Sequence, residues 1–456
     1  MTPAYCIVGG GISGLAAAYR LRATLGESVE ITVFDPASRL GGVLRTETVG
    51  GAPMDVGAEA FVVRRPEATD LLAELGLAGR QLRPTGARPL LYSQRRLKPL
   101  PADTLNGIPA SAQSMLGLVD EATIARIEAE PGHPLSWREG DDPSLAQLVA
   151  ERFGEQVVAR SVDPLVGGVY AGTAATIGVR SAVPALAAEL DRGAPSLTEA
   201  VRRAQPPATG APVFGAVAGG YAVLVDALVR RSRLRWVQSA VRQVDRGPAG
   251  WRLRDSAGGS WHADGLILAL PAAGLARLAT GIAPRAAAAA SRINCASAVV
   301  VAMAVPAGAG LPDNSGVLVA TGEPLRAKAI TLSSRKWGSW GYGGKLELLR
   351  LSFGRFGDTA RVDTAASDAE LLRWAVQDLQ TVFGVAADPV DARVQRWSAA
   401  MPQYRPGHAQ LIADLRAGLP AGVAIAGNYL AGIGVPACIA TADSAVADVI
   451  SATAAG

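Results

Sequence analysis

The first residues whose types and spacing could do chemistry form a glycine-rich turn of pattern GxGxxG at Gly9, Gly11 and Gly14. Gly9 would make the tight turn, Gly11 would let the backbone approach a pyrophosphate, and Gly14 would let a helix pack closely on a strand. The first amides of that helix, at Ile12 and Ser13, would face the phosphates, where the helix dipole favours negative charge. The pattern therefore predicts a dinucleotide-binding turn.

Three elements must position this turn: a strand at residues 4–8, a helix at 15–25 and a second strand at 29–34. Asp35 and then Pro36 follow the second strand, and about twenty residues separate Asp35 from the last glycine of the turn. This is the spacing expected for a carboxylate on a ribose hydroxyl. A glycine-rich turn that binds nothing is the alternative, but strand, helix, strand and acid occur together here. We therefore expect a βαβ unit of an α/β fold.

The residues after Asp35 favour FAD over NAD as the dinucleotide. Two adjacent glycines would let the main chain lie against a flat ring system, and an arginine could reach a phosphate or a flavin oxygen. An Asp-x-Gly sequence follows at residues 55–57. The predicted cofactor contacts of this stretch are Arg39, Gly41, Gly42, Val43, Gly57, Ala58 and Glu59.

The C-terminal part of the sequence carries a second glycine-rich region. A predicted strand at residues 423–426 leads into this region, and a helix is expected at 437–450. The N-terminus of that helix, aimed at the N1/C2 carbonyl edge of a flavin, would stabilise the charge of the reduced ring. An ordinary loop that caps a helix is the alternative. The predicted cofactor residues here are Gly427, Asn428, Gly434, Val435 and Pro436.

Composition excludes several classes of protein. The chain has 456 residues, of which 49% are hydrophobic and 18% charged. We therefore expect two or three domains with buried hydrophobic cores and no extended disorder. Its net charge of +4 has no basic cluster, which disfavours nucleic-acid binding. Three cysteines without a CxxC pair and three scattered histidines predict neither a metal site nor a disulfide framework.

The sequence gives no indication of export or membrane insertion. The first predicted strand begins so early that no signal peptide is expected. The longest apolar stretches, residues 265–274 and 296–304, are too short or too interrupted to span a bilayer, and we expect buried strands there. We therefore expect a cytoplasmic bacterial protein whose contact with a membrane is at most peripheral.

Three distant segments share the character of a nucleotide-binding domain. A central segment begins with Gly219-Gly220-Tyr221, follows a Pro- and Gly-rich linker at 205–219, and continues as a helix and several strands. Helical patterns fill one intervening piece, and β-rich alternation fills another. The expected division is an FAD-binding domain at 1–65, 208–280 and 396–456, an α+β substrate domain at 66–90 and 281–395, and a helical subdomain at 91–207.

Taken together, these motifs resemble the flavin amine oxidase and porphyrinogen oxidase superfamily. Further motifs are similar to those of the HemY-type porphyrinogen oxidases, and the resemblance covers essentially the whole chain. It is strongest to the bacterial group that acts on coproporphyrinogen III. These motifs are residues 152–154 (RFG), 168–172 (GVYAG), 329–337 (AITLSSRKW), 354–358 (GRFGD) and 401–408 (MPQYRPGH). Asn428 departs from the pattern, where an acid is common, and so does 440–442 (ATA).

The resemblance implies how the protein would act. It implies a Rossmann-like FAD domain, non-covalent FAD, molecular oxygen as electron acceptor, and three two-electron oxidations that yield coproporphyrin III and peroxide. It also places Val241 and Trp397 at the cofactor. Because the flavin performs the oxidation, no strong side-chain base is required, and the catalytic proton acceptor stays unassigned. Transient docking to a ferrochelatase is a further implication.

Four propionates on coproporphyrinogen would require an apolar slot with arginines at its rim. Core packing is as good a role for Tyr170 as substrate contact, and each arginine could be a solvated surface charge. His408 is interpreted as a structural histidine rather than a catalytic one. The substrate residues that the resemblance implies are Arg64, Arg65, Tyr170, Ala171, Gly172, Val317 and Leu318.

Three other functions stay open. The same chemistry on protoporphyrinogen IX needs fewer arginines, because that substrate has two propionates. An amine oxidase is disfavoured, because aromatic residues make up only 5% of the chain and no C-terminal Tyr/Trp pair occurs. A non-catalytic porphyrin carrier would bind a tetrapyrrole without consuming oxygen.

Overall fold

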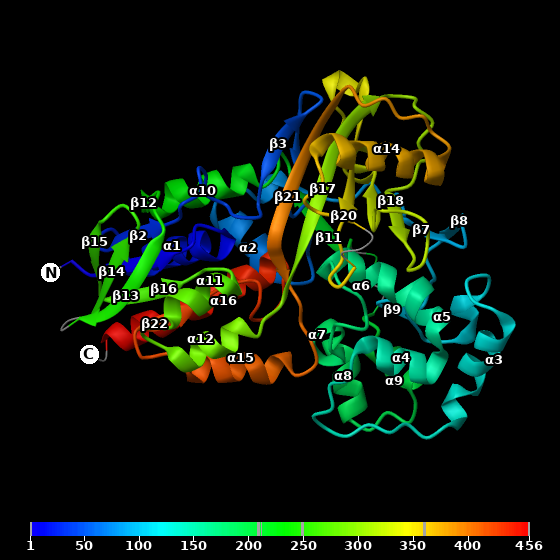
Figure 1. Cartoon of the computed structure of the whole chain (residues 1–456), viewed down its shortest axis with the longest axis horizontal. Helices are drawn as coiled ribbons and strands as arrows, with labels where there is room; N and C mark the ends of the chain where they lie inside the picture. The colour runs from blue at the N-terminus through cyan, green and yellow to red at the C-terminus, as the bar shows by residue number, and fades with distance from the viewer. Residues whose placement is uncertain (1, 208–209, 211, 248–249, 359–361, 455–456) are drawn as a thin grey trace.

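A five-stranded parallel sheet holds the glycine-rich turn in the computed structural model, which describes residues 2–207, 210, 212–247, 250–358 and 362–454 (Figure 1). Strands from three distant parts of the sequence pair within it, so the predicted discontinuous α/β unit is confirmed. The turn follows the carboxyl end of its central strand, where ligands bind in such sheets. The strand order is β12 (Arg235–Val237), β2 (Glu30–Phe34), β1 (Ala4–Val8), β16 (Gly265–Leu268) and β22 (Val423–Ile425).

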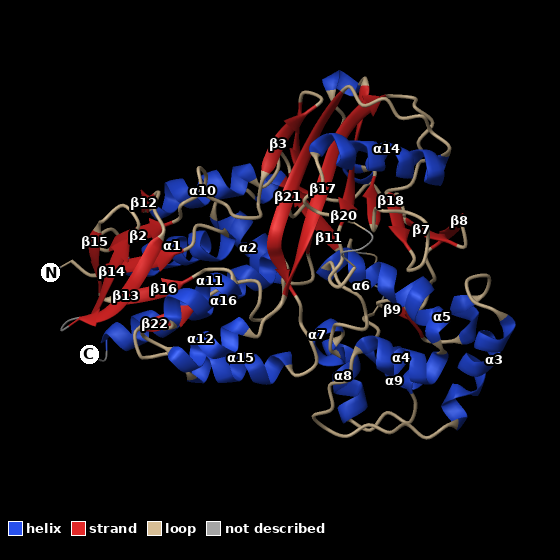
Figure 2. Ribbon diagram, in the orientation of Figure 1, coloured by secondary structure: helices blue, strands red, loops and turns tan. Residues whose placement is uncertain are grey.

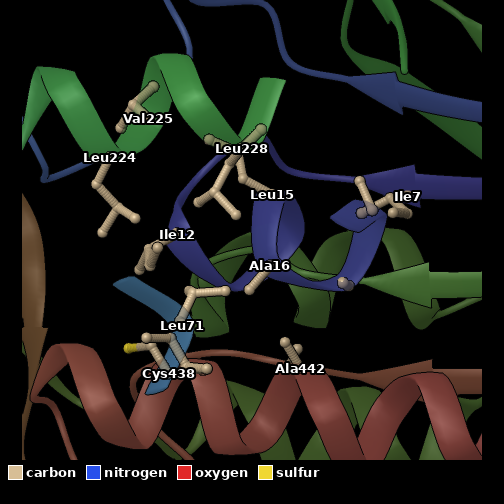
Figure 3. Close-up of a cluster of buried hydrophobic side chains, with 14 of the residues drawn as sticks. Ile7, Ile12, Leu15, Ala16, Leu71, Leu224, Val225, Leu228, Cys438 and Ala442 are labelled. Carbon is tan, nitrogen blue, oxygen red and sulfur yellow. The ribbon is translucent and has the colours of Figure 1, made fainter. Parts of the chain in front are cut away.

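Three helices from the same three segments pack together on one face of this sheet. They are α1 (Ile12–Leu25), α10 (Ala222–Ser232) and α16 (Val435–Ala454). Figure 3 shows Leu15 of α1 and Leu228 of α10 pointing toward each other, and both are fully buried. The short helix α2 (Pro66–Glu74) joins the same cluster through Leu71. None of these helices can bury its apolar stripe without the other segments.

Helix α16 is long and apolar enough to cross a membrane, by length and composition alone. However, 56% of its apolar window is buried inside the protein. It packs along α1 and contacts β22, so here it is a core helix. The sequence predicts this helix at residues 437–450, and the structure adds two residues at its N-terminal end and four at its C-terminal end.

Helices α11 (Ala272–Ala279), α12 (Pro284–Ser291) and α15 (His408–Ala417) cover the opposite face of the sheet. A three-stranded antiparallel meander of β13 (Val241–Gly247), β14 (Gly250–Asp255) and β15 (Ser260–Ala263) packs beside them. Parallel sheets require cover on both faces, and the two helical layers supply it.

A second, seven-stranded sheet stands beside the nucleotide-binding part (Figure 2). Its long strand β17, next to the edge strand β21, is apolar on both sides, because α14 (Asp368–Phe383) covers one face and the hairpin β3 (Thr46–Val49)–β4 (Ala52–Asp55) packs against the other. The strand order is β21 (Asp391–Pro402), β17 (Cys295–Pro306), β20 (Leu346–Phe353), β19 (Ala329–Thr331), β18 (Gly316–Val319), β7 (Leu90–Ser93) and β8 (Arg96–Pro99).

Residues between β8 and the central segment form a separate helical lobe with its own core. Buried Glu130 ties this lobe together, because its carboxylate pairs with Arg152 at 2.7 Å and accepts from the amides of Leu197 and Thr198. The helices are α3 (Glu121–Ala129), α4 (Leu145–Phe153), α5 (Glu155–Val157), α6 (Asp163–Tyr170), α7 (Val179–Ala182), α8 (Pro184–Asp191) and α9 (Leu197–Ala204).

The packing moves several of the boundaries that we drew from the sequence. α2 and α12 lie in the nucleotide-binding cores, the hairpin β3–β4 packs on the seven-stranded sheet, and β7 and β8 belong to that sheet. Strand β21 crosses the boundary at 395 without a break. Short hydrophobic segments could not reveal which core they join.

The predicted linker also contains a strand. Strand β11 (Phe214–Val217) pairs with β5 (Phe61–Val62) and β6 (Gln81–Leu82), whereas residues 208, 209 and 211 lie outside the described part of the chain.

Candidate functional site

Two glycine-rich loops touch where α1 begins. The amide of Gly41 donates to the carbonyl of Gly10 at 2.8 Å, and a Cβ on Gly42 would lie 3.0 Å from the Cα of Gly11. By contrast, a Cβ on Gly11 would meet no protein atom closer than 4.0 Å. Gly11 is therefore not required by packing, and the space beside it is open to a ligand.

The structure gives each predicted glycine of the turn a separate reason. A Cβ on Gly9 would come within 2.2 Å of the carbonyl oxygen of Ala269, and one on Gly14 within 1.9 Å of the carbonyl of Gly9. Helix α1 begins at Ile12 without a side-chain cap, so its first amides, which include that of Ser13, lack a capping side chain. This is the arrangement that accepts a phosphate.

Asp35 lies at the carboxyl end of β2 and orders the turn. Its two carboxylate oxygens accept from the amides of Gly10 at 2.7 Å and Ala37 at 2.9 Å. Each oxygen keeps a lone pair for another donor, such as a ribose hydroxyl. Pro36 is exposed beside it, and Val241 starts β13 in the segment that follows β12.

Arg39 makes contacts that the sequence did not predict. Its guanidinium donates to the carbonyls of Leu40, Gly42 and Leu44, and burial lowers the pKa of the group. The side chain thus fastens the second glycine loop from within. Its expected reach to a phosphate or flavin oxygen stays a prediction.

The strip of residues 55–59 runs next to this loop, and the packing leaves no space for a side chain at Gly57. A Cβ on Gly57 would lie 1.8 Å from the carbonyl of Val43, and the amide of Ala58 donates to that same oxygen at 3.2 Å. The indole of Trp397 donates to the carbonyl of Val56 at 2.9 Å. Predicted cofactor residues from three parts of the chain are therefore neighbours.

Arg350 of β20 fixes the strip from the opposite side. Its guanidinium is buried and donates to the carbonyls of Asp55 at 2.7 Å and Gly57 at 2.9 Å. The sequence analysis missed this residue, because nothing in a strand sequence shows that its side chain will contact carbonyls in a distant loop.

Glu59, which we predicted at the cofactor, forms an ion pair with Lys336 at 2.9 Å and accepts from Ser333 at 3.0 Å. Burial alone would raise the pKa of this carboxyl, but Lys336 and Arg350 outweigh burial and lower it to about 2. Glu59 is therefore an anion at physiological pH. Lys336 lies in the 329–337 motif, which was the available signal for it.

The pKa of Asp55, four residues before Glu59, is shifted in the opposite direction. Burial raises its pKa to about 6, although it accepts from the hydroxyl of Thr46 at 2.6 Å and from the amide of Tyr221 at 3.0 Å. Thr46 in turn accepts from the amide of Ala222. These two side chains thus satisfy the first amides of α10 from a distant hairpin.

The C-terminal loop is held by a tyrosine that we did not single out. The hydroxyl of Tyr404 donates to the carbonyl of Asn428 at 2.7 Å and accepts from the amide of Gly432 at 2.8 Å. The side chain of Asn428 donates to the carbonyl of Ala400 at 3.0 Å. This bracing fixes the loop that leads from Gly427 to the start of α16.

His408 is a structural residue, as we interpreted it. Its ring is buried 4.1 Å from that of Tyr404, and its Nε2 lies 2.7 Å from the carbonyl of Tyr429. Burial lowers the pKa of the imidazole, so it stays neutral.

The N-terminus of α16 faces the first glycine turn. Gly434 is exposed, Val435 and Pro436 are buried, and the next turn carries buried Cys438. The hydroxyl of Ser13 interacts with the Cys438 thiol, and burial raises the pKa of that thiol to about 11. The first and last helices therefore meet at the same place.

These residues fit a flavin dinucleotide. The open space at Gly11, the uncapped start of α1, the free lone pairs of Asp35 and the converging α16 supply the groups that its diphosphate, ribose and ring need.

The predicted substrate residues of the helical lobe form one turn after α6. Ala171 ends this helix with a φ of +49°, and a Cβ on Gly172 would lie 2.3 Å from the Oε1 of Gln403. Gln403 donates through Nε2 to the carbonyl of Tyr170 at 2.8 Å. Tyr170 itself donates to the carbonyl of Ser181 at 3.2 Å, so its hydroxyl is already engaged.

Val317 and Leu318 point to opposite faces of β18. Val317 is 1% exposed and packs in the cluster under α14, so we withdraw it as a stacking surface. Leu318 lies 3.6 Å from the Cβ position of Gly168, two residues before Tyr170, and keeps its place beside the turn. Strand alternation, which places successive side chains on opposite faces, is the reason.

The two predicted arginines are in different environments. Arg65 pairs with Glu67 at 2.8 Å, and its Nη1 lies 3.5 Å from the carbonyl of Ala431, next to the C-terminal loop. Arg64 is exposed, and its guanidinium has no hydrogen bond or ion pair within the described residues. Arg64 is thus the better placed of the two for an anionic ligand.

Comparisons with known proteins agree with this geometry. The model of the family described as flavin containing amine oxidoreductase matches residues 12–450. The chain is 64% identical over 453 residues to coproporphyrinogen III oxidase of Mycobacterium tuberculosis H37Rv, covering 99% of this chain and 98% of the relative. It is 27% identical over 467 residues to coproporphyrinogen III oxidase of Bacillus subtilis, covering 98% and 97%.

Solved structures share the fold. A structure from Exiguobacterium sp. 255-15, provisionally assigned as a protoporphyrinogen oxidase, superposes with a TM-score of 0.87 at 25% identity and covers 98% of this chain and 99% of that chain. A putrescine oxidase structure superposes with a TM-score of 0.72 at 19% identity, covering 99% and 100%, and supports the fold alone.

Proposed function

Since this chain belongs to the flavin containing amine oxidoreductase family, we propose that it is an FAD-dependent oxidase that converts coproporphyrinogen III to coproporphyrin III. The observation that carries this proposal is the 64% identity to a coproporphyrinogen III oxidase over 99% of the chain. At that identity the site is expected to keep its chemistry, and each predicted cofactor loop is present in the fold.

Bound FAD would supply the two-electron chemistry of each of the three oxidation steps, with molecular oxygen as the final acceptor and peroxide as its product. The residues of the chain would position the substrate against the cofactor and exclude side reactions, and would not themselves react. Gly11 leaves room for the cofactor, Gly42 and Gly57 let the neighbouring loops pack closely, and Arg350 and Trp397 hold the 55–59 strip in place. The Glu59–Lys336 ion pair ties the end of this strip to the 329–337 segment.

The substrate carries four propionates around an apolar macrocycle. We propose that the macrocycle lies against Leu318 and the Tyr170–Gly172 turn, where Gly168 and Val169 are exposed. Arg64 would bind a propionate. Arg65 would position the C-terminal loop beside the substrate through its contact with Ala431. No residue of the chain is assigned as the acceptor of the pyrrole protons. A cytoplasmic location and transient docking to a ferrochelatase complete the proposal.

The test begins with porphyrinogens prepared without air. Purified FAD-loaded protein is mixed in air with coproporphyrinogen III or protoporphyrinogen IX, and porphyrin fluorescence is followed beside enzyme-free controls. The proposal predicts rapid, oxygen-consuming fluorescence growth with coproporphyrinogen and slower growth with protoporphyrinogen. The reverse order of rates would assign protoporphyrinogen as substrate. Identical traces with and without protein would leave only a carrier, and oxygen consumption with putrescine alone would indicate an amine oxidase.

A further inference from the structure

A buried lysine outside the proposed catalytic site lacks a partner for its charge. Lys328 immediately precedes β19, is 7% exposed, and donates through Nζ to the carbonyl of Gly354 at 3.0 Å. Within the described part of the chain this is the one hydrogen bond of its ammonium, which carries three donors. No carboxylate there lies within 4.0 Å of the ammonium.

The surroundings of Lys328 are themselves cationic. Burial and the neighbouring Arg355 and Arg350 lower the pKa of Lys328 to about 7. Arg350 is committed to the carbonyls of the 55–59 strip, and Arg355 donates to Thr321 at 3.1 Å and to the carbonyl of Val319 at 2.9 Å. Burying an uncompensated ammonium costs several kcal/mol, so such a group is normally paired or neutral.

A small cavity lies directly beside this ammonium. Its volume is about 10 Å³, which is room for about one water-sized particle. Lys328, Arg355 and Arg326 line it together with a single carboxylate, that of Asp358. Arg326 is exposed at the mouth of the cavity, where its guanidinium stacks 4.9 Å from the ring of Trp374. Three basic residues and one acidic residue are therefore among the described residues that line the cavity.

We propose that this cavity is a binding site for one small monovalent anion, with chloride as its occupant. Chloride is a compact anion somewhat larger than water and would accept from the two remaining Nζ hydrogens of Lys328. It would also compensate the positive charge of the Lys328 ammonium. The site is separate from the flavin residues, and the argument does not depend on the proposed function.

The site is built into a segment that supports the helical lobe. Gly354 and Arg355 belong to the 354–358 motif, and the amide of Phe356 donates to the carbonyl of Ala171 at 2.7 Å. A bound anion would fix the position of this motif and, through Phe356, of the turn after α6. Occupancy should therefore appear as thermal stability of the whole protein.

The test compares salts that differ only in the anion. Melting temperatures of the FAD-loaded protein are measured in sodium chloride and in sodium gluconate at equal ionic strength, because gluconate is too large to enter. We expect chloride to raise the melting temperature of the natural protein by about 1 to 3 °C. Lys328→Met should lose this chloride-specific rise. Lys345→Met removes an exposed lysine and should keep it.

Crystals soaked in sodium bromide provide a second readout that needs no variant. An anomalous peak within hydrogen-bonding distance of Lys328 Nζ supports the proposal. A cavity that holds only water, shown by no bromide peak and equal melting temperatures in both salts, overturns it. A chloride-specific rise that persists in Lys328→Met also overturns it. If Lys328→Met fails to fold, the bromide experiment decides alone.

Discussion

Arg350 donates a 2.9 Å hydrogen bond to the carbonyl of Gly57, across 293 residues of sequence. The contact joins the middle of the seven-stranded sheet to the strip that lines the proposed flavin site. Because the guanidinium is planar and donates to two carbonyls at once, it holds that strip in one orientation relative to the sheet.

Arg350→Met should destabilise the protein and weaken FAD binding together. Two buried carbonyls lose their donor, and Glu59 loses a nearby cation, so we expect a loss of about 2 to 4 kcal/mol in the free energy of unfolding. Chemical denaturation and the flavin-to-protein absorbance ratio after gel filtration measure the two effects. Arg373→Met, on the exposed face of α14, is the control and should change neither by much. Unchanged flavin retention in Arg350→Met would contradict the positioning role.

Glu59 and Lys336 should be energetically coupled. A double-mutant cycle of Glu59→Gln and Lys336→Met is expected to give a coupling of about 1 to 3 kcal/mol, because the pair is largely buried. The exposed pair Arg233–Glu27 is the matched control, with less than about 0.5 kcal/mol expected. The pKa of Glu59 is lowered to about 2, so its stabilisation is complete above pH 4.5 and is lost as the pH falls toward 2. Equal coupling in both pairs would refute the assignment.

Asp55 should make the protein less stable as the pH rises from about 4 to 6. Its pKa is raised to about 6 from an ordinary value near 4, so the folded state binds the extra proton in this range. The contribution amounts to at most about 3 kcal/mol. Asp55→Asn keeps an acceptor for Thr46 and Tyr221 and should flatten this slope in urea titrations, whereas exposed Asp388→Asn should not. An unaltered slope in Asp55→Asn would show that another group titrates.

Gly11→Ala should separate folding from cofactor binding. The backbone of Gly11 has an ordinary φ of −74°. The nearest described protein atom to a Cβ at this position is the Cα of Gly42, at 4.0 Å. The cofactor-free variant should therefore unfold at nearly the natural temperature. Its affinity for FAD should fall at least about tenfold, because the Cβ occupies the expected pyrophosphate space. Gly281→Ala, in open space on the same domain, should bind FAD normally.

Arg64→Gln should raise the KM for coproporphyrinogen III more than the kcat changes, because an exposed arginine would contribute to binding rather than to chemistry. We expect about a three- to tenfold rise, and a smaller one with protoporphyrinogen IX, which has half the propionates. Arg254→Gln, on the exposed face of β14, is the control. Equal effects on both substrates would remove Arg64 from the propionate contacts.

The residues that sequence reasoning placed correctly are those with local signals. The spacing of Gly9, Gly11 and Gly14 predicts their turn. The alternation of apolar residues around Val299 predicts a strand, and the helical periodicity around Leu228 predicts a helix. Arg350 has no such signal, and the motifs that contain Lys336 and Tyr404 do not show their contacts, because all three roles depend on which distant carbonyl, carboxylate or amide the fold brings beside them. Arg39 shows the same limit, since its type suggests phosphate while its loop offers three carbonyls.

The strand β11 escaped prediction because four residues between proline and glycine carry too little pattern. Val317 was misplaced for a different reason. Alternation separates it from Leu318, but which of the two faces the core depends on α14, more than forty residues away in the sequence.

The packing of α1 against α16 has a consequence for how the protein is made. The turn for the diphosphate leaves the ribosome more than 400 residues before the helix that completes its core and braces Ser13. The nascent nucleotide-binding unit must therefore wait, partly unburied, until that helix has been synthesised. Folding of this kind is slow and exposed to misassembly. Shortening the chain by its final helix should yield aggregated, colourless protein rather than a smaller working domain.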